Sequence, residues 1–346
     1  MESTVVKIAR RLSNLILAAF LAGLLASLSW RLLAGTGDKP TGNPNIASPA
    51  AAKIVAPSLI HPVNPLNFGA KCDGVTDDSA AFQAALTAGD VKVPAGTCVI
   101  DRTVKIMVSN RHLECSHDTT LKQTDPYAKS MFEIVSTDEG TLTGDSIANC
   151  LFVGANTVAP RFFDGDARHW NIPVGTQGRV NNFILIGNTF SRFFGQAMFQ
   201  TYGQVDGGSG DIIAYNHFES CGYYGAVFVA HRNGYIGHNV LIDCALGVEN
   251  DNPGQMSGGN IIEYNKITAV HGYGAPDMGA AALLTGGTAG GANYSTNVVR
   301  YNTVTGMAKK AHNFITVLPS IIWQKASGGA AQYMQNTCLD GCKVIR

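Results

Sequence analysis

The sequence predicts an all-β fold: a single-stranded right-handed parallel β-helix with a short N-terminal capping helix. The main observation is a phrase that returns along the chain: two or more apolar residues, two variable positions, an asparagine, one variable position and an apolar residue. Flanking residues that favour strands, and a composition low in charge and rich in glycine, support the same fold. The strong copies are centred on Asn188, Asn216, Asn239, Asn265 and Asn302, with weaker copies at Asn156 and Asn336.

The spacing of the phrase is typical of a solenoid. Successive strong copies lie 28, 23, 26 and 37 residues apart. Each unit of a solenoid buries its apolar face against its neighbours, and insertions go into outward loops. No stretch between copies has helical periodicity, so turns and short strands must return the chain to the same phase. A right-handed β-helix with coils about 4.8 Å apart meets this requirement.

Equivalent residues of successive coils stack in such a helix. We therefore expect the side-chain amides of the asparagines to hydrogen-bond in a ladder along the axis. The alternative is that each asparagine only favours a bend in its own coil. The ladder is favoured because the copies share residues on both sides of the asparagine.

Composition and charge agree with one elongated domain. Charged residues make up 14% of the chain, against about a quarter in average proteins, and there are 39 glycines. The 25 acidic and 25 basic residues give a net charge of zero. No global field then attracts a polyanion, so we expect no nucleic-acid partner.

The N-terminus has the pattern of a targeting segment. Basic residues precede an uncharged, Leu- and Ala-rich run over 12–30. This length lies between a long signal-peptide core and a short membrane-spanning helix, and the nearest small-residue cleavage site is at 50–52. Residues 1–33 are thus predicted to be a signal peptide or an N-terminal membrane anchor. Either way the body is exported, periplasmic or extracellular, and any membrane attachment involves residues 12–30 only.

A linker and the β-helix domain follow this segment. Residues 34–63 carry Gly, Pro, Ala, Ser and Asn with few large apolar residues, which predicts a flexible tether. The β-helix domain is predicted over 64–346. The sequence does not predict the oligomeric state.

The first part of this domain predicts a capping helix over 79–88. Thr76 or Asp77 is its expected N-cap, with an acid in the first turn, and Gly89 ends it. Its buried stripe is predicted to be Ala81, Phe82, Ala85 and Leu86. Such a helix suits the open end of a solenoid, where an exposed coil would invite edge pairing. A strand-turn-strand unit is expected from Val91 to Ile100.

This region also carries a family resemblance. The run Phe68-Gly69-Ala70-Lys71-Cys72-Asp73-Gly74-Val75-Thr76-Asp77-Asp78, the Ala81-Phe82 helix, and Val93-Pro94-Ala95-Gly96-Thr97 with Ile100 resemble the first segment of pectate lyase superfamily proteins. That group includes rhamnogalacturonase- and epimerase-like domains and phage tailspikes. The repeated phrase extends the likeness over most of 64–346. The resemblance implies a pectin-lyase-like β-helix that acts on a polysaccharide.

The chain departs from the family pattern in two ways. It has none of the polygalacturonase motifs Asn-Thr-Asp, Gly-Asp-Asp, Gly-His-Gly and Arg-Ile-Lys, nor the Asp-Pro-His-Asp of alginate epimerases. Cys72 stands where the family often has glycine and Cys98 where it often has an aromatic residue, which leaves a bridge between them open. The resemblance therefore implies a fold more strongly than a reaction.

The other cysteines test the register. Cys221 and Cys244 each follow a phrase asparagine by five residues, so stacking of the asparagines also stacks these cysteines. Contact between them is predicted, as a disulfide or as packed thiols. Cys338 and Cys342 would close a short terminal loop. Cys115 and Cys150 are not placed by the pattern, and no cysteine spacing indicates zinc.

One coil breaks the hydrophobic pattern of its second strand. Four aligned segments are apolar, whereas the fifth contains Glu249, Asn250 and Asp251. Such a violation is typical of functional sites. Glu249 and Asp251 share a strand face with Cα atoms about 6.6–7 Å apart. His231 and Arg232 leave the preceding coil nearby, so all four side chains are predicted to meet in one groove.

These residues suit two reactions on sugars. Hydrolysis of a glycosidic bond uses two carboxyl groups. Elimination from a uronic acid uses a base and a cation, which can be an arginine or calcium held by Glu249 and Asp251. The alternative is an ordinary solvated turn. The predicted catalytic residues are Glu249, Asp251, His231 and Arg232, and the predicted substrate-binding residues are Asn250, Tyr202 and Tyr224.

The predicted function is that of an exported polysaccharide-active enzyme, a lyase or glycoside hydrolase of an acidic, uronate-containing glycan. The alternative is a non-catalytic glycan-binding or surface-structural β-helix. The absence of the family's catalytic motifs keeps both open.

Overall fold

The structure is a computed structural model of the 346-residue chain. It describes residues 54–137, 140–155, 171–193, 195–200, 207–221, 225–244, 246–250, 258–268, 281–285, 294–305, 320–324, 332–339 and 343–345. The chain divides into two compact units, Met1–Lys39 and Pro40–Arg346, and all described residues belong to the second.

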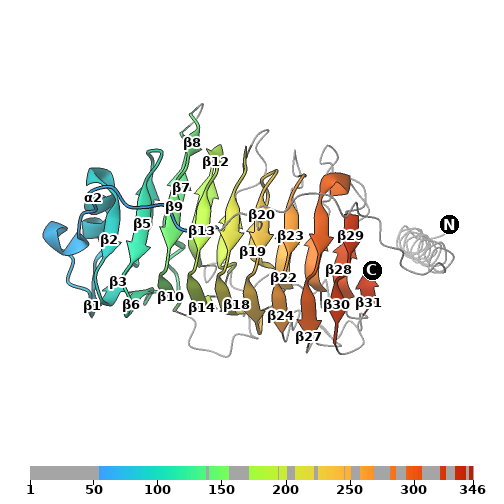
Figure 1. Ribbon diagram of the computed structural model, residues 1–346. Helices are drawn as coiled ribbons and strands as arrows, with labels where there is room; N and C mark the ends of the chain where they lie inside the picture. Colours follow the sequence, from blue (N-terminus) through green and yellow to red (C-terminus); the bar gives the residue numbers. More distant parts are fainter. Residues whose placement is uncertain are drawn as a thin grey trace, which may run out of the picture. The chain divides into compact units, whose positions relative to one another are not determined.

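The described strands stack into four parallel sheets (Figure 1). Sheet A contains β2 (Val91–Val93), β5 (His112–Cys115), β9 (Ser146–Ala148), β13 (Ile184–Ile186), β17 (Ile212–Ala214), β20 (Tyr235–Gly237), β23 (Ile261–Glu263), β26 (Val298–Arg300) and β29 (Gln332–Met334). Sheet B contains β1 (Asp73–Asp77), β3 (Gly96–Val99), β6 (Thr119–Lys122), β10 (Leu151–Val153), β14 (Thr189–Phe193), β18 (His217–Cys221), β21 (Val240–Ile242), β24 (Lys266–Thr268), β27 (Thr303–Thr305) and β30 (Thr337–Cys338).

Two further sheets complete the coils. Sheet C contains β4 (Val104–Ile106), β7 (Ser130–Val135), β11 (Ile172–Gln177), β15 (Met198–Gln200), β19 (Gly225–Val229), β22 (Leu246–Asn250), β25 (Ala281–Thr285), β28 (Ser320–Gln324) and β31 (Lys343–Ile345). The short sheet D contains β8 (Leu142–Thr143), β12 (Val180–Asn181) and β16 (Gly208–Ser209). Each turn of the chain adds one strand to sheets A, B and C in that order. The predicted right-handed parallel β-helix is confirmed.

The repeated phrase is the corner between sheets A and B. The residue before the asparagine has a left-handed backbone, with φ of 57° at Tyr215, 56° at His238 and 55° at Tyr264. This single residue turns the chain, and the asparagine that follows points into the core. Outside the corner, the rings of Tyr215, His238, Tyr264 and Tyr301 stack with centroids 4.8–5.0 Å apart.

The asparagine ladder is confirmed. Each side-chain Nδ2 donates to Oδ1 of the asparagine in the next coil at 2.9–3.1 Å, from Asn188 to Asn336. The backbone N–H of each donates to the same oxygen, and the five asparagines of the strong copies are at most 1% exposed. Asn156 lies outside the described residues. Cys150 holds the ladder position of its coil, since its N–H donates to Asn188 Oδ1.

Helix α2 (Ser79–Ala88) closes the N-terminal end, preceded by the 3-10 turn η2 (Pro65–Phe68). The predicted buried stripe of α2 is confirmed, and Gly89 ends the helix. Phe82 contacts Phe132 with centroids 6.1 Å apart, and Phe132 begins a column of rings that passes through Phe152, Phe190 and Phe218. The helix therefore seals the core rather than lying beside it.

The predicted N-cap and the predicted acid in the first turn are wrong. Residues 73–77 form strand β1, so the helix begins later, with Asp78 as its N-cap. The carboxylate of Asp78 accepts the N–H groups of Lys71 and Cys72 instead of capping the helix. Asp77 accepts the N–H of Ser79 from outside the helix.

The predicted linker is described only from residue 54. Its last part is attached to the β-helix: Val63 forms a parallel bridge with Val91, and the N–H of Ile60 donates to Asp90. The predicted leader, residues 1–33, lies outside the described residues. None of the helices that the structure describes has both the length and the apolar character needed to cross a bilayer.

The cysteines follow the stacked register. Cys72 is bridged to Cys98, and Cys115 to Cys150, each pair linking adjacent coils. Cys338 is disulfide-bonded, and Cys342 lies outside the described residues. The predicted contact between Cys221 and Cys244 is present, but as two buried free thiols and not as a bridge.

We expect these two thiols to be unreactive in the folded protein. A hydrogen bond with Cys244 and burial raise the pKa of the Cys221 thiol, so little thiolate forms at neutral pH. Titration with a chromogenic disulfide reagent should detect neither thiol before unfolding and both after it. A Cys221→Ser, Cys244→Ser double variant is the control. Rapid reaction of the native protein would contradict the buried placement.

Candidate functional site

The long connections of the chain gather at the two ends of the sheet C strands. Sheets A and B are joined in most coils by a left-handed residue and an asparagine, whereas residues 201–206 follow β15, 251–257 follow β22 and 269–280 precede β25. These three connections lie outside the described residues. Binding and catalytic residues concentrate on loops held by a rigid scaffold. The outer face of sheet C is therefore the candidate functional site.

Glu249 lies on this outer face. Its strand β22 alternates, with Val248 in the core and Asn250 hydrogen-bonded inside, so the side chain between them points outward. The register places Glu249 beside Phe228 of β19. Glu249 is nevertheless only 3% exposed and Phe228 5%. The site is thus a carboxyl group in a covered part of the face, beside one aromatic ring.

His231 lies on the other side of sheet C, inside the β-helix. Its Nδ1 is 2.6 Å from Asp211 Oδ2, and its backbone N–H donates to Gln200 Oε1 at 2.9 Å. Its Nε2 lies 3.5 Å from Thr176 Oγ1. All four residues are at most 2% exposed. The predicted meeting of His231 with Glu249 in one groove is wrong, because His231 follows the strand at a corner where the chain turns inward.

Asn250 is also inside and not at the predicted substrate surface. Its Nδ2 donates to Val229 O at 2.9 Å, and its Oδ1 accepts a hydrogen bond from Asn297. Asn260 in turn donates to the backbone oxygen of His231 at 3.0 Å. This buried network ties β22 to the neighbouring coils. Asn250 therefore positions the strand that carries Glu249.

The remaining predicted site residues are only partly described. Arg232 is half-buried at the outer corner beyond sheet C, where it pairs with Ser209 as an extension of sheet D. Asp251, Tyr202 and Tyr224 lie outside the described residues. Calcium binding by Glu249 and Asp251 therefore stays a prediction.

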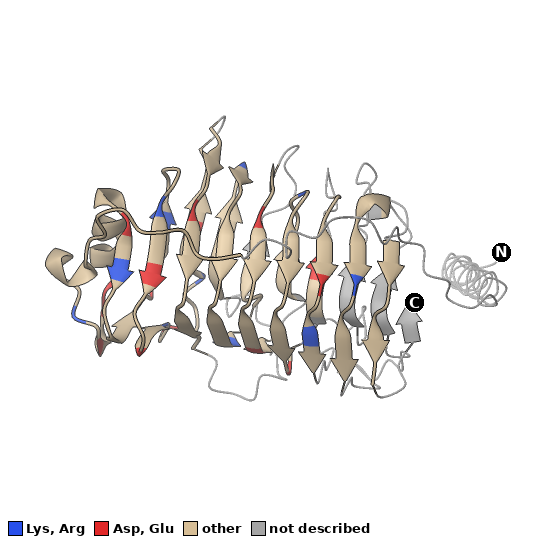
Figure 2. Cartoon of the chain, in the orientation of Figure 1, with Lys and Arg blue, Asp and Glu red and all other residues tan. Residues whose placement is uncertain are grey.

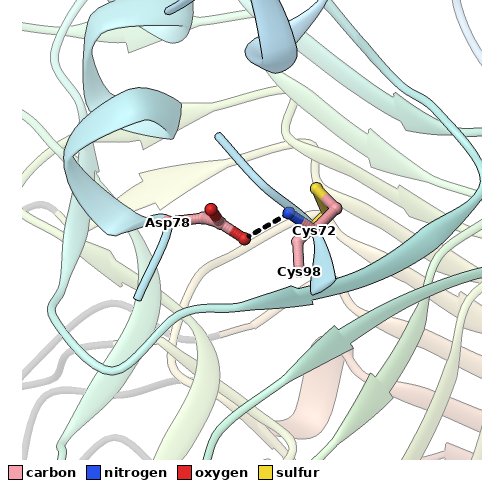
Figure 3. Close-up of side chains that lie close together, drawn as sticks. All are labelled: Cys72, Asp78 and Cys98. Atoms are coloured by element: carbon pink, nitrogen blue, oxygen red, sulfur yellow. Dashed lines mark hydrogen bonds between the residues drawn. A yellow bond between two sulfur atoms is a disulfide. The ribbon is translucent and has the colours of Figure 1, made fainter. Parts of the chain in front are cut away.

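Within the described residues, one group of side chains has the spacing of a metal site. It consists of Cys72, Asp78 and Cys98. Figure 3 shows why it is structural: the two sulfur atoms are bonded to each other, and the Asp78 carboxylate faces the N–H of Cys72. The other oxygen of the Asp78 carboxylate accepts a hydrogen bond from the N–H of Lys71. The group ties the residues before β1 to β3 and to the start of α2.

A second polar column, which the repeated phrase did not reveal, lies at the corner before sheet A. Its members accept the backbone N–H of the residue one coil earlier, at 2.7–2.9 Å. A signal for it exists, because in three coils an Asp or Asn stands five residues before the ladder asparagine. Phenylalanine and glycine take this position in other coils and obscure it. The members are Asp145, Asp211, Asn260 and Asn297.

Asp145 of this column gives the protein a pH-dependent stability. Burial raises the pKa of Asp145 to about 7. The hydrogen bond from the Arg111 backbone N–H and the positive charge of Arg111 lower this pKa, but burial has the larger effect. Between about pH 4 and pH 7 only the folded state then holds the proton, so stability falls as pH rises through this window. We expect Asp145→Asn to remove this component, which is at most about 4 kcal/mol.

The measurement is urea unfolding of both proteins from pH 4.5 to 8. Asparagine suits the position because Asn260 and Asn297 occupy it in later coils. The control is Asp118→Asn, since Asp118 is exposed and its backbone is left-handed. Parallel pH profiles for wild type and Asp145→Asn would contradict the assignment.

Comparison with known proteins shows the fold alone. No family model and no curated protein matches the sequence. Among solved structures, iota-carrageenase of family GH82 from A. fortis has a TM-score of 0.58 at 14% identity, over 82% of this chain and 62% of that one. An iota-carrageenase complexed to iota-carrageenan fragments gives 0.59 at 14% identity, over 82% and 61%.

Two other β-helix proteins are similar at the same level. A tailspike protein of E. coli bacteriophage HK620 in complex with a pentasaccharide gives a TM-score of 0.53 at 14% identity, over 81% of this chain and 57% of that one. The Streptococcus pneumoniae surface protein and adhesin PfbA gives 0.51 at 14% identity, over 82% and 99%. The chain thus spans about three-fifths of the length of the carrageenases.

Proposed function

We propose that this β-helix binds and cleaves an acidic polysaccharide that lies across the outer face of sheet C, as a lyase or a glycoside hydrolase. The observation that carries the proposal is Glu249, an acid on the outward side of its strand, nearly fully buried beside Phe228. Taking a carboxyl group out of water costs free energy even where the group has polar partners. A functional role explains why the chain keeps one there.

Glu249 would supply one of the two carboxyl groups that either reaction uses. A general acid must be protonated, and a carboxyl group can take that role. Asp251, two residues further along the chain, would be the second carboxyl group for hydrolysis. For elimination the pair would hold calcium against the sugar carboxylate.

Basic residues in reach of the same face favour an acidic glycan. Arg232 lies at the outer corner, and Lys105 occupies the outward column of Glu249 five coils away, about 24 Å along the axis. A polymer running along the helix axis would pass both. Figure 2 shows charges of both signs scattered over the strands, so binding would depend on such local contacts rather than on a global field.

The structural neighbours support a sugar as ligand. A carrageenase and a tailspike of this fold were solved with saccharides bound. The adhesin neighbour is consistent with the alternative, in which the protein binds a glycan without cleaving it. Export of the chain, with the leader as signal peptide or anchor, is part of the same proposal.

The test is a panel of acidic and neutral polysaccharides incubated with the protein. Ultraviolet-absorbing unsaturated products would identify a lyase, and loss of activity with a chelator would add calcium. New reducing ends without that absorbance would identify a hydrolase. Binding without products would support the alternative, and neither binding nor products on any glycan would overturn the proposal.

A further inference from the structure

The inner face of sheet C changes character toward Glu249. One buried column of side chains runs along this face, and each member is at most 2% exposed. The column starts with isoleucine and becomes mainly polar. In chain order its members are Ile106, Ile134, Thr176, Gln200, Val229 and Asn250. Polar groups in a core need hydrogen-bond partners that apolar residues do not, so this change asks for a reason.

Gln200 and Asp211 hold the chain just beyond the end of β19 from inside. Gln200 Oε1 accepts the backbone N–H groups of Ala230 and His231, each at 2.9 Å. Gln200 Nε2 donates to Asp211 Oδ2 at 2.8 Å, and the same oxygen lies 2.6 Å from His231 Nδ1. All four residues are at most 2% exposed. The corner at 230–231 is therefore fixed by buried side chains from earlier in the chain.

A second set of bonds leads from this corner to β22. Asn260 Nδ2 donates to His231 O at 3.0 Å and lies 3.5 Å from Asn250 Oδ1. Asn250 Nδ2 donates to Val229 O at 2.9 Å. Asn250 and Glu249 are neighbours in β22 and leave it on opposite faces. A shift of His231 would therefore move the segment to which Asn250 is bonded, and Glu249 with it.

The carboxylate of Asp211 does more than the corner requires. Asn260 and Asn297 occupy the same column and accept a backbone N–H at 2.7 and 2.9 Å with an amide oxygen. An ionisable pair such as Asp211 and His231 costs free energy to bury, and apolar residues of similar volume are often as stable. What the carboxylate adds is one oxygen that binds both Gln200 and His231.

We propose that Asp211 and His231 are positioning residues for the site on the other side of sheet C. Their buried pair fixes the chain at the end of β19 and, through Asn260 and Asn250, the place of Glu249. His231 then acts from inside the β-helix and exchanges no proton with the substrate. This inference rests on the proposed function of Glu249. Rates depend steeply on such placement, since a shift of about 1 Å can cost about 100-fold.

The first test is Asp211→Asn, which keeps the size of the side chain and the oxygen that accepts the N–H of Phe183. It puts an NH₂ donor where Oδ2 faced Gln200 and His231. We expect kcat to fall at least about 10-fold and KM to stay within about 3-fold, because the placement of Glu249 changes and the substrate contacts do not.

The matched control is Asp145→Asn, the same change in the same column two coils earlier, about 10 Å along the axis. Its kcat and KM should stay within about 3-fold of wild type, even though its stability changes. Both variants are assayed where their unfolding curves show a folded protein. Wild-type kcat in folded Asp211→Asn would overturn the proposal.

The second test distinguishes positioning from proton transfer at His231. The side-chain NH₂ of asparagine can take the place of Nδ1 and keep the bond to Asp211, whereas leucine fills a similar volume without a donor. We expect His231→Asn to keep kcat within about 3-fold and His231→Leu to lose at least about 10-fold. A general acid or base would lose about 100-fold or more in both variants, and that result would contradict the proposal.

A double-mutant cycle separates this inference from the proposed function. In the background of Glu249→Gln, the change Asp211→Asn should lower the residual turnover less than about 2-fold, because it acts through Glu249. Multiplied losses would contradict the positioning role. Wild-type turnover in Glu249→Gln would instead remove the proposed function. A loss in Glu249→Gln with none in Asp211→Asn would remove the positioning role alone.

Hydrogen exchange tests the same coupling without a substrate. We expect the amides of β22 to exchange at least about 10-fold faster in Asp211→Asn than in wild type, since the segment that Asn250 is bonded to is less firmly held. The amides of β7 should exchange as in wild type, and Asp145→Asn should leave β22 unchanged. Unchanged exchange of β22 in Asp211→Asn would overturn the proposal even if no glycan were cleaved.

Discussion

Replacing Asn239 by alanine is expected to lower the free energy of unfolding by about 3–5 kcal/mol. Its Oδ1 accepts the backbone N–H and the side-chain amide of Asn216 at 2.9 and 3.1 Å. Its Nδ2 donates to Ile213 O and to Asn265 Oδ1 at 2.9 and 3.0 Å. Asn239 is 0% exposed, so water cannot replace these bonds. Each buried group left without a partner costs about 1–3 kcal/mol.

The measurement is the urea midpoint and slope of the purified domain, compared with wild type. Asn336→Ala is the matched control, because Asn336 makes the same ladder bonds at the half-buried end of the column. Water can reach the groups left behind there, so a loss of about 1 kcal/mol is expected. Equal losses at the two positions would show that burial does not set the strength of the ladder.

The fold was predictable because one local feature repeats. From Asn188 to Asn336, a left-handed residue precedes an inward asparagine at this corner of each coil, and stacking of the coils favours the same side chain at each repeat. The corner between sheets A and B can therefore be recognised directly from the repeated sequence phrase. The corner before sheet A is recorded less clearly, since the position of Asp211 is filled by Phe183 and Gly234 in adjacent coils.

The candidate site was predictable only in part. Residue spacing predicts which face of the sheet a side chain points to within one strand, but this alternation does not continue across a corner. Glu249 and Asn250 alternate within β22, so their opposite directions follow from the strand. His231 lies beyond the end of β19, where the chain bends. The direction of its side chain therefore could not be extrapolated from the alternation within the strand. Its partner Asp211 comes from the coil before, at a corner that the pattern did not reveal.

Replacing Glu249 by glutamine is expected to reduce turnover of the cleaved polysaccharide about 100- to 10,000-fold while leaving the fold intact. Glutamine keeps the size of the side chain but cannot exchange a proton. The covered position beside Phe228 leaves little room for water to take over that role. The product assay that identifies the substrate also provides the rate.

The matched control is Glu133→Gln. Glu133 lies in the same outward column, four coils or about 19 Å away, and is only half-buried. We expect its turnover to change less than about 3-fold, which is the scale of a peripheral contact. Unfolding curves of both variants separate a loss of chemistry from a loss of structure.

The way in which turnover falls distinguishes the two reactions. If Glu249 is the general acid of a hydrolase, an aryl glycoside with a good leaving group should be cleaved by Glu249→Gln almost as fast as by wild type, because that leaving group needs no proton. If Glu249 instead holds calcium for elimination, raising the calcium concentration should restore part of the lost activity. Full activity of Glu249→Gln on the natural polymer would remove Glu249 from the site and leave Asp251 and Arg232 as the remaining candidates.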